Sequence, residues 1–241
     1  MDIFRKTTSR PDQAGAEAAG LEWLGEATHA VVQVLELEDY QIGTEKVREV
    51  APTADAAREF GAELARMHAA GAPAFGAPPE GWEGKNFIGR VEQACEPTDD
   101  WGEFYAEQRV LPFARKARMT PEQLELVEKA CELIKAQSWD VKPARIHGDL
   151  WAGNLLFGEH GGVMIDPAAH GGHPHTDLGM LRYSVRRIWM RSSKATVRQQ
   201  ISMTGFPLHQ LHPLAVHSLT HGSAYHRSLA QAAKATIDLL G

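Results

Sequence analysis

The feature that most restricts the fold is the segment HGDLWAGN at residues 147–154, followed by IDP at residues 165–167. It places Asp149 and Asn154 at the two ends of one short loop. Between Asn154 and Asp166 the chain has an apolar run, a glycine-containing turn and a second apolar run, which is the pattern of two short strands. We therefore expect the second strand to be buried and to carry Asp166 at its end.

Side chains of these types in this order favour one kind of chemistry. In kinase-type phosphoryl transfer, one carboxylate accepts the proton of the attacking hydroxyl. An amide oxygen and another carboxylate hold Mg²⁺ against the nucleotide phosphates. An isolated Asp beside a Gly is usually a turn residue. Here the required residues occur together on one loop and one strand end, so a phosphoryl-transfer site is the stronger interpretation.

The length and composition are those of an ordinary globular protein. The 241 residues can bury the core of one large domain or of two lobes. The net charge is −6 without a basic block, which argues against nucleic acid or a membrane surface as a partner. No apolar run approaches the roughly 20 residues that cross a bilayer, and no signal peptide is apparent. Cys95 and Cys131 are isolated in sequence, so we expect a reducing, cytoplasmic setting.

Local patterns predict a few strands near the N-terminus and helices after them. Apolar and β-branched runs predict the strands, and amphipathic periodicity with Thr53, Gly71 and Pro121 as terminal signals predicts the helices. The expected strands are residues 3–6, 30–37 and 41–47, and the expected helices are 13–25, 53–70, 99–116, 120–136 and more from 177 onward. Residues 71–89 are rich in Gly and Pro and predict a long loop. This order indicates an α+β fold with a small N-lobe, residues 1–46, and a larger, mainly helical C-lobe, residues 47–241.

Three further charged positions are candidates for the site. Lys6 lies on the first expected strand, and in kinase-like folds a strand lysine contacts the phosphates and pairs with a helix glutamate. Glu17, in the first expected helix, is a suitable partner, although a strand-end lysine can also be a solvated surface charge. Asp177 is expected to be a buried carboxylate that accepts hydrogen bonds from the loop backbone or from His147. The alternative is a helix N-cap, and the two roles are compatible.

Aromatic and histidine residues give weaker signals. Trp101, Phe104 and Tyr105 share one helix face, where core packing is the favoured interpretation and the wall of an acceptor pocket is the alternative. Trp151 is a better pocket candidate, because a tryptophan inside the loop has little core to fill. Five histidines raise the possibility of a transition-metal site, but none has Cys or Glu at ligand spacing. They are His170, His173, His175, His217 and His221.

The sequence resembles the fructosamine kinase, or ketosamine-3-kinase, family, which is related to aminoglycoside phosphotransferases and has a protein-kinase-like fold. The likeness covers nearly the whole chain and includes the two opening motifs and the Asn-Phe-Ile-Gly block at residues 86–89. That block and the Trp after HGDL separate the family from generic aminoglycoside or choline kinases. The other matching segments are residues 4–6, 17–21, 60–68, 100–109, 171–173 and 177–178.

The resemblance implies an ATP-dependent kinase that phosphorylates the 3-hydroxyl of fructosamine or ketosamine adducts and so acts in deglycation. The substrate would be a small-molecule or protein-bound glycated amine. Carried over by motif, Asp149 is the base, and Asn154 and Asp166 bind Mg²⁺. Lys6 and Glu17 orient the phosphates of ATP.

The resemblance also implies an inter-lobe hinge and a substrate pocket. The backbone of the hinge, which meets adenine, corresponds to Thr44, Glu45, Lys46 and Val47. The pocket is expected to include Trp151, His147, Asp177, Trp101 and His173. An aminoglycoside- or choline-type phosphotransferase on the same fold, or a catalytically impaired kinase-like remnant, is the alternative.

The chain departs from the family pattern in two places. It begins only five residues before Lys6, without the two strands and the Gly-rich phosphate-covering loop of the family. Our hypothesis is a mis-assigned start codon or a truncated chain, which leaves the N-lobe incomplete. Residues 182–205 are basic and lack helical periodicity, where the family has an apolar, acidic helical segment. A shifted reading frame can encode a family-like peptide there, so we expect two compensating frameshifts. The nucleotide sequence tests this hypothesis.

Overall fold

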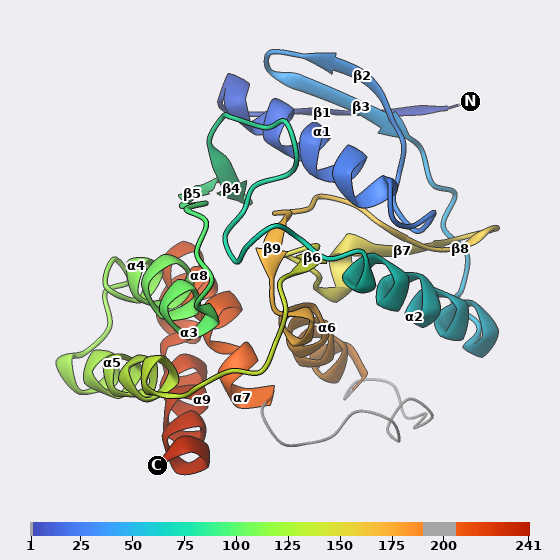
Figure 1. Cartoon of the computed structure of the whole chain (residues 1–241). Helices are drawn as coiled ribbons and strands as arrows, with labels where there is room; N and C mark the ends of the chain where they lie inside the picture. Colours follow the sequence, from blue (N-terminus) through green and yellow to red (C-terminus); the bar gives the residue numbers. More distant parts are fainter. Residues whose placement is uncertain (1, 190–205) are drawn as a thin grey trace. The chain divides into compact units, whose positions relative to one another are not determined.

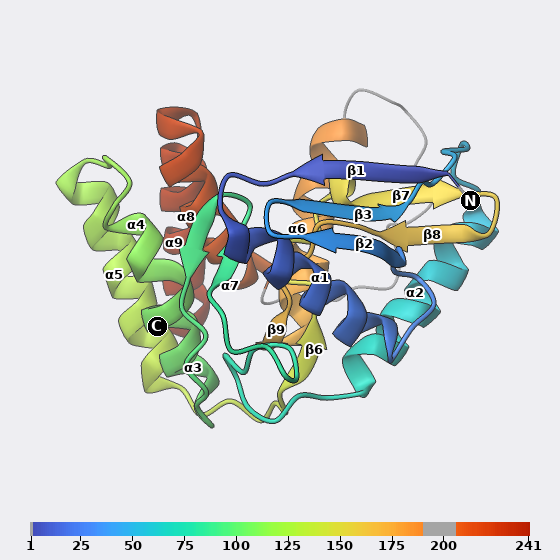
Figure 2. The same cartoon turned by 90° about the horizontal axis from the view of Figure 1, so that it is seen from above.

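The computed structural model describes residues 2–189 and 206–241 and mixes helices with short strands (Figure 1 and Figure 2). The described residues form two compact units. The first contains the residues up to Asp99 together with Lys142–Asp177, and the second contains Asp100–Val141 and the described residues from Leu178 onward. The expected boundary after residue 46 does not coincide with this grouping, and the division into lobes 1–46 and 47–241 stays a prediction.

The first unit begins with a three-stranded antiparallel sheet and a helix packed on it. The strands are β1 (Ile3–Thr7), β2 (Val34–Glu38) and β3 (Gln41–Glu45), in the spatial order β1-β3-β2. Helix α1 (Pro11–Gly25) starts with a proline, which suits a first turn because the N–H there has no helical partner. Leu21 and Ala18 of α1 pack with Ile42 of β3 in one buried cluster. This packing holds the helix that carries Glu17 beside the strand that carries Lys6.

The rest of the first unit consists of a helix and paired short strands. Helix α2 (Ala54–Ala69) starts at Thr53, whose hydroxyl accepts the Ala56 N–H as predicted for an N-cap. The antiparallel pairs are β4 (Asn86–Ile88) with β5 (Val91–Gln93), β6 (Ala144–Ile146) with β9 (His170–Gly172), and β7 (Leu155–Gly158) with β8 (Gly161–Met164). The loop at residues 147–154 therefore connects β6 to β7.

The second unit is helical and has an aromatic core. Its helices are α3 (Trp101–Phe104), a π-helical turn (Tyr105–Val110), α4 (Leu111–Ala114), α5 (Pro121–Ala136), α7 (Phe206–His209), α8 (Leu211–Thr220) and α9 (His226–Leu240). Helix α6 (Pro174–Trp189) starts in the first unit and continues in the second. The buried Tyr105 hydroxyl donates to the Leu208 carbonyl at 2.7 Å and accepts the His212 N–H at 3.2 Å, which ties the π-helical turn to α7 and α8.

Three expected elements differ from the observed ones for identifiable reasons. The helix expected at residues 99–116 contains the π-helical turn just before Pro112, because proline has no N–H to complete the helical ladder. The strand expected at residues 30–37 is regular only from Val34, since Val31 forms an isolated bridge to Met164. The loop expected at residues 71–89 ends earlier, because β4 begins at Asn86.

Part of the basic segment at residues 182–205, namely residues 190–205, lies outside the described residues, and the frameshift hypothesis stays a prediction. Across residues 2–189 and 206–241, every helix is too short or too polar to cross a membrane.

Candidate active site

The loop at residues 147–154 requires a glycine at its second position. Gly148 has φ +78°, a left-handed conformation that side chains disfavour. A Cβ at this position would lie 2.3 Å from the Ala168 carbonyl oxygen. Only glycine therefore lets the loop pass the segment that follows Asp166 at this distance. The loop closes with a 3₁₀ turn, Ala152–Asn154, which brings Asn154 back toward Asp149.

The Asp177 carboxylate binds the backbone of this loop. Its Oδ2 accepts the His147 N–H at 2.9 Å and its Oδ1 accepts the Gly148 N–H at 2.9 Å. Oδ2 also contacts Nε2 of His68, from α2, at 2.9 Å. Burial disfavours the charged carboxylate, but hydrogen bonding and the nearby imidazoles outweigh it, so the pKa of Asp177 is lowered. Asp177 lies in the first turn of α6 and is not its N-cap.

His147 connects the loop to the end of the strand pair β7–β8. Its Nε2 lies 2.9 Å from the Ile165 carbonyl, and its Nδ1 accepts the Asp149 N–H at 3.2 Å. These partners require the neutral tautomer with the proton on Nε2, and burial lowers the pKa of the ring accordingly. The expectation that His147 and Asp177 contribute to the substrate pocket stays a prediction. Both side chains are buried beneath the loop and hold its backbone.

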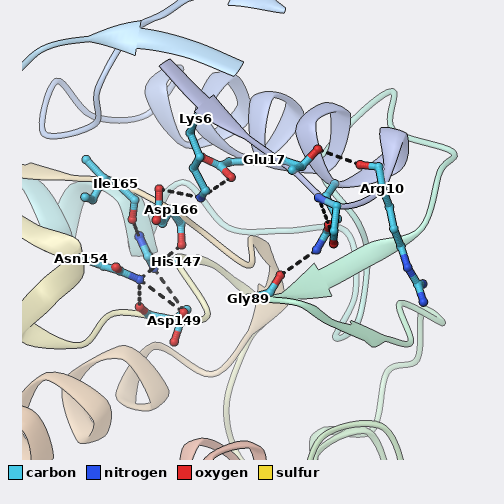
Figure 3. A network of polar contacts seen from close by, with 12 residues as sticks. Lys6, Arg10, Glu17, Gly89, His147, Asp149, Asn154, Ile165 and Asp166 are labelled. Carbon is cyan, nitrogen blue, oxygen red and sulfur yellow. Dashed lines mark hydrogen bonds and ion pairs between the residues drawn. The ribbon is translucent and has the colours of Figure 1, made fainter. Parts of the chain in front are cut away.

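Asp149 and Asn154 lie side by side in the loop (Figure 3). The Asn154 amide nitrogen donates to the Asp149 carbonyl at 2.9 Å and to the Asp149 carboxylate at 3.3 Å. It also lies 3.4 Å from the Asp166 carbonyl oxygen. Burial, followed by the negative charge of Asp166, raises the pKa of Asp149 to about 7. A carboxylate with such a pKa is suited to accept a proton.

Lys6 forms the link between the sheet and the second aspartate. Its Nζ lies 2.8 Å from Glu17 Oε2 and 3.0 Å from Asp166 Oδ1 (Figure 3). Burial opposes the charge on Lys6, but the two carboxylates outweigh this effect and raise its pKa. Burial also raises the pKa of Glu17 to about 7, despite the cation beside it. The pairing of Lys6 with Glu17 that the sequence analysis expected is therefore present.

Asp166 has an unusual backbone conformation. It has φ +54°, the sole left-handed residue other than glycine within residues 2–189 and 206–241. Such a conformation costs about 1–3 kcal/mol and persists only where the surrounding structure enforces it. The turn directs the Asp166 carboxylate toward Lys6, and 41% of its side chain remains exposed.

A cavity of about 370 Å³ opens beside these charged groups. Its wall contains Lys6, Glu17 and Asp166 together with the apolar side chains Leu21, Val32, Ile42, Leu156 and Ile165. The segment expected to be a hinge, Thr44, Glu45, Lys46 and Val47, lines the same cavity. The Glu45 N–H donates to the Gln33 carbonyl and the Lys46 N–H to the Asp2 carbonyl. No hydrogen bond among the described residues uses the Val47 N–H.

The remaining pocket candidates separate into different environments. The Trp151 side chain lies in the loop, folded over Gly153, and is 42% exposed. Trp101 is 2% exposed and packs with Tyr105 and Trp139 at ring-centroid distances of 5.0 and 4.6 Å. The Trp101 ring therefore packs in the core of the second unit, in agreement with the favoured interpretation, and the pocket-wall alternative stays a prediction. Burial lowers the pKa of His173 to about 3, and its place in a substrate pocket stays a prediction.

The oxygen atoms at the site suit a hard divalent cation. Asn154 offers an amide oxygen and Asp166 a carboxylate, and the Asn154 amide contacts both Asp149 and Asp166. Carboxylate and carbonyl oxygens are the ligands that Mg²⁺ prefers. The donor set therefore fits Mg²⁺ at Asn154 and Asp166.

The sequence analysis missed several residues that hold this site. His68 supports Asp177, and the amides of Asn86 and Gln93 contact the carbonyls of Ala169 and Ala168. His68 and Asn86 occur in the segments that resemble the family, but nothing in their local sequence indicates these contacts.

Comparisons with known proteins place these motifs in a family. The family model for fructosamine kinase matches residues 8–231. A protein-ribulosamine 3-kinase, chloroplastic, from Arabidopsis thaliana is 34% identical over 128 residues, which are 51% of this chain and 38% of that protein. A probable ketoamine kinase from Synechocystis is 38% identical over 128 residues, 50% of this chain and 41% of that protein. The matches thus span less than half of the length of these curated relatives.

Solved structures show the same relationship. A protein from Thermobifida fusca that carries the name fructosamine-3-kinase has a TM-score of 0.83 and 40% identity, with 98% of this chain and 85% of that chain covered. A thermostable mutant of an aminoglycoside phosphotransferase has a TM-score of 0.61 at 11% identity, with 98% of this chain and 86% of that chain covered, and this likeness shows the fold alone. The predicted α+β, protein-kinase-like fold is confirmed. The chain belongs to the fructosamine kinase family.

Proposed function

We propose that this chain transfers the γ-phosphoryl group of ATP to the 3-hydroxyl of a ketosamine, a 1-amino-1-deoxy-2-ketose attached to an amine. The observation that carries the proposal is the continuous polar chain from Glu17 through Lys6 to Asp166, next to Asp149 and Asn154 (Figure 3). Relatives named protein-ribulosamine 3-kinase and ketosamine-3-kinase support the choice of acceptor. Phosphorylation of the sugar would destabilise the adduct, so the reaction would act as deglycation.

The cavity beside Lys6 is the proposed nucleotide site. Its apolar wall would cover the adenine ring, and the Val47 N–H, which no hydrogen bond among the described residues uses, would donate to it. The Lys6 ammonium, already held by Glu17, would contact the phosphates. Because Glu17 fixes the lysine in place, little conformational entropy remains to be lost when the phosphates bind.

Asn154 and Asp166 would hold Mg²⁺, which supplies neutralisation of the phosphate charge when it is bound. Asp166 would be oriented for this role by its left-handed turn and by Lys6, which contacts Oδ1. The Asn154 side chain is buried and held by Asp149, so its orientation is fixed before a ligand arrives.

Asp149 would accept the proton of the sugar 3-hydroxyl as the oxygen attacks. A new bond forms between that oxygen and the γ-phosphorus, the bond from the γ-phosphorus to the bridging oxygen breaks, and ADP leaves with its electron pair. Positioning and charge neutralisation supply most of the rate enhancement in such reactions. The exposed indole of Trp151, two residues from Asp149, would form one wall for the sugar.

The test is an assay of the purified chain with ATP, Mg²⁺ and one acceptor at a time. 1-Deoxy-1-morpholinofructose should be phosphorylated at O3, as read by phosphorus NMR, and kanamycin and choline should not. Asp149→Asn should lower kcat by about 10²–10⁴-fold, the usual contribution of a positioned base, while nucleotide binding measured by thermal shift stays unchanged.

Two outcomes would contradict the proposal. Transfer to kanamycin or choline in preference to the ketosamine would reassign the acceptor. Absence of a thermal shift at millimolar Mg-ATP would identify a remnant that does not bind nucleotide.

A further inference from the structure

Two buried amides on the β4–β5 hairpin contact the chain just beyond Asp166. Asn86 and Gln93 are each 4% exposed and stand opposite one another in the register. The Asn86 Nδ2 donates to the Ala169 carbonyl at 3.1 Å. The Gln93 Nε2 donates to Asn86 Oδ1 at 2.7 Å and lies 3.5 Å from the Ala168 carbonyl. The hairpin therefore satisfies two carbonyls within three residues of Asp166.

The same hairpin is tied to the helix that carries Glu17. The Gln13 Nε2 donates to the carbonyl of Gly89 at the hairpin turn at 3.1 Å. Gln13 is 8% exposed, and its Oε1 accepts the N–H and the hydroxyl of Ser9. Gln13 lies one helical turn before Glu17. The bond from Gln13 to Gly89 therefore fixes the part of α1 that pairs with Lys6 through Glu17.

Helix α1 also packs directly on the segment after Asp166. A Cβ on Gly20 would lie 3.2 Å from the side chains of both Pro167 and Ala169, so the absence of a side chain allows the close approach. The hairpin, α1 and residues 166–169 therefore form one closed set of contacts. Each of the two acidic partners of Lys6 is carried by one member of that set.

We propose that the β4–β5 hairpin is a positioning element that holds Glu17 and Asp166 in the arrangement needed for Lys6 and the metal, with Asn86, Gln93 and Gln13 as its positioning residues. The strained turn at Asp166 needs such support, because a residue with φ +54° relaxes unless its neighbours prevent it. Buried amides suit this task, because each unmade hydrogen bond would leave a polar group without a partner. This inference deepens the proposed function and rests on it for the catalytic consequence alone.

The hairpin offers a matched control on its exposed side. Glu92, between Val91 and Gln93, forms ion pairs with Lys85 at 2.9 Å and with Arg10 at 3.4 Å, and all three side chains are about half exposed. Exposed pairs of this kind contribute little to stability. Glu92→Gln therefore changes the same hairpin without touching the buried amides.

The first experiment uses no acceptor sugar and compares wild type, Asn86→Leu, Gln13→Leu and Glu92→Gln by hydrogen–deuterium exchange. Asn86→Leu should speed exchange of residues 166–172 by about tenfold, the ratio expected for the loss of one buried hydrogen bond, while α5 in the second unit keeps its wild-type rate. Gln13→Leu should do the same for residues 13–21. Glu92→Gln should match wild type.

A kinetic measurement separates positioning from general stability. Asn86→Leu should raise KM for Mg-ATP about tenfold, with the KM for 1-deoxy-1-morpholinofructose unchanged. A variant that merely unfolds in part would lower the apparent kcat and leave both KM values alone. Unchanged exchange at residues 166–172 in Asn86→Leu, or equal acceleration throughout the chain, would overturn the proposal. A wild type without transferase activity would instead contradict the proposed function, and the exchange experiment would still decide the role of the hairpin.

Discussion

Replacing Asp177 by Asn tests the support beneath the loop, because the change removes the charge and keeps the size. In the wild type, Oδ2 receives the His147 N–H and Nε2 of His68, and Oδ1 receives the Gly148 N–H. The best orientation of the Asn places its oxygen at the Oδ2 position. Its NH₂ group then faces the Gly148 N–H, and this donor loses its partner.

The expected cost follows from these three contacts. A buried donor without a partner costs about 1–3 kcal/mol, and each of the two remaining bonds weakens by about 1 kcal/mol when its acceptor is no longer charged. Asp177→Asn should therefore lower the free energy of unfolding by about 3–5 kcal/mol. Total stabilities are about 5–15 kcal/mol, so the variant folds where the wild type is more stable than this cost. Urea unfolding followed by tryptophan fluorescence measures the difference, and Asp140→Asn, at an exposed aspartate, is the control.

The pH dependence gives a second check on the same group. The pKa of Asp177 is lowered in the folded protein. The ionised carboxylate therefore contributes fully to the stability of the folded protein above the unfolded pKa of about 3.9. This contribution is lost as the pH falls through the folded pKa. The difference in the free energy of unfolding between wild type and Asp177→Asn should reach its full value at about pH 5. It should become smaller below about pH 4. A difference in the free energy of unfolding under about 0.5 kcal/mol at neutral pH is the range of ordinary surface substitutions. Such a result would refute the view that Asp177 supports the loop.

Three further substitutions test other parts of the description by the same unfolding measurement. Gly148→Ala should lower the free energy of unfolding by at least about 2 kcal/mol and abolish phosphoryl transfer, because its Cβ would meet the Ala168 carbonyl at 2.3 Å in a left-handed conformation. A stable, active variant would contradict the close approach of the loop to Ala168. Gly61→Ala should stabilise the protein by about 0.5–1 kcal/mol, since it lies inside α2 with no atom within 4 Å of the new Cβ; destabilisation would contradict an open helix face. Thr120→Ala should lower the free energy of unfolding by about 1 kcal/mol through loss of the capping box of α5. An unchanged free energy of unfolding would mean that the cap is not formed in solution.

Sequence reasoning reached the parts of the site that are close together along the chain. Asp149 and Asn154 precede one strand–turn–strand unit and Asp166 follows it, and short-range patterns of apolar and glycine residues are enough to predict that unit. Lys6 and Glu17 are eleven residues apart, and their pairing required only that the helix fold back on the preceding strand.

Sequence reasoning left alternatives open where only packing chooses between equivalent patterns. Trp101 has the helical spacing of either a core residue or a pocket wall, and only its contacts with Tyr105 and Trp139 show that it lies in a core. His147 is the first residue of the loop, yet its ring contacts the Ile165 carbonyl beneath it.

The sequence by itself therefore determined the local order that brings Asp149, Asn154 and Asp166 together, and these are the residues proposed to carry the chemistry. Only the tertiary structure decided what holds them, because the supporting partners are far away along the chain. His68 and Asp177 are 109 residues apart, and Asn86 and Ala169 are 83 apart. A hydrogen bond at such separation leaves no periodic signal, since it depends on how distant elements pack and not on the spacing of their own residues.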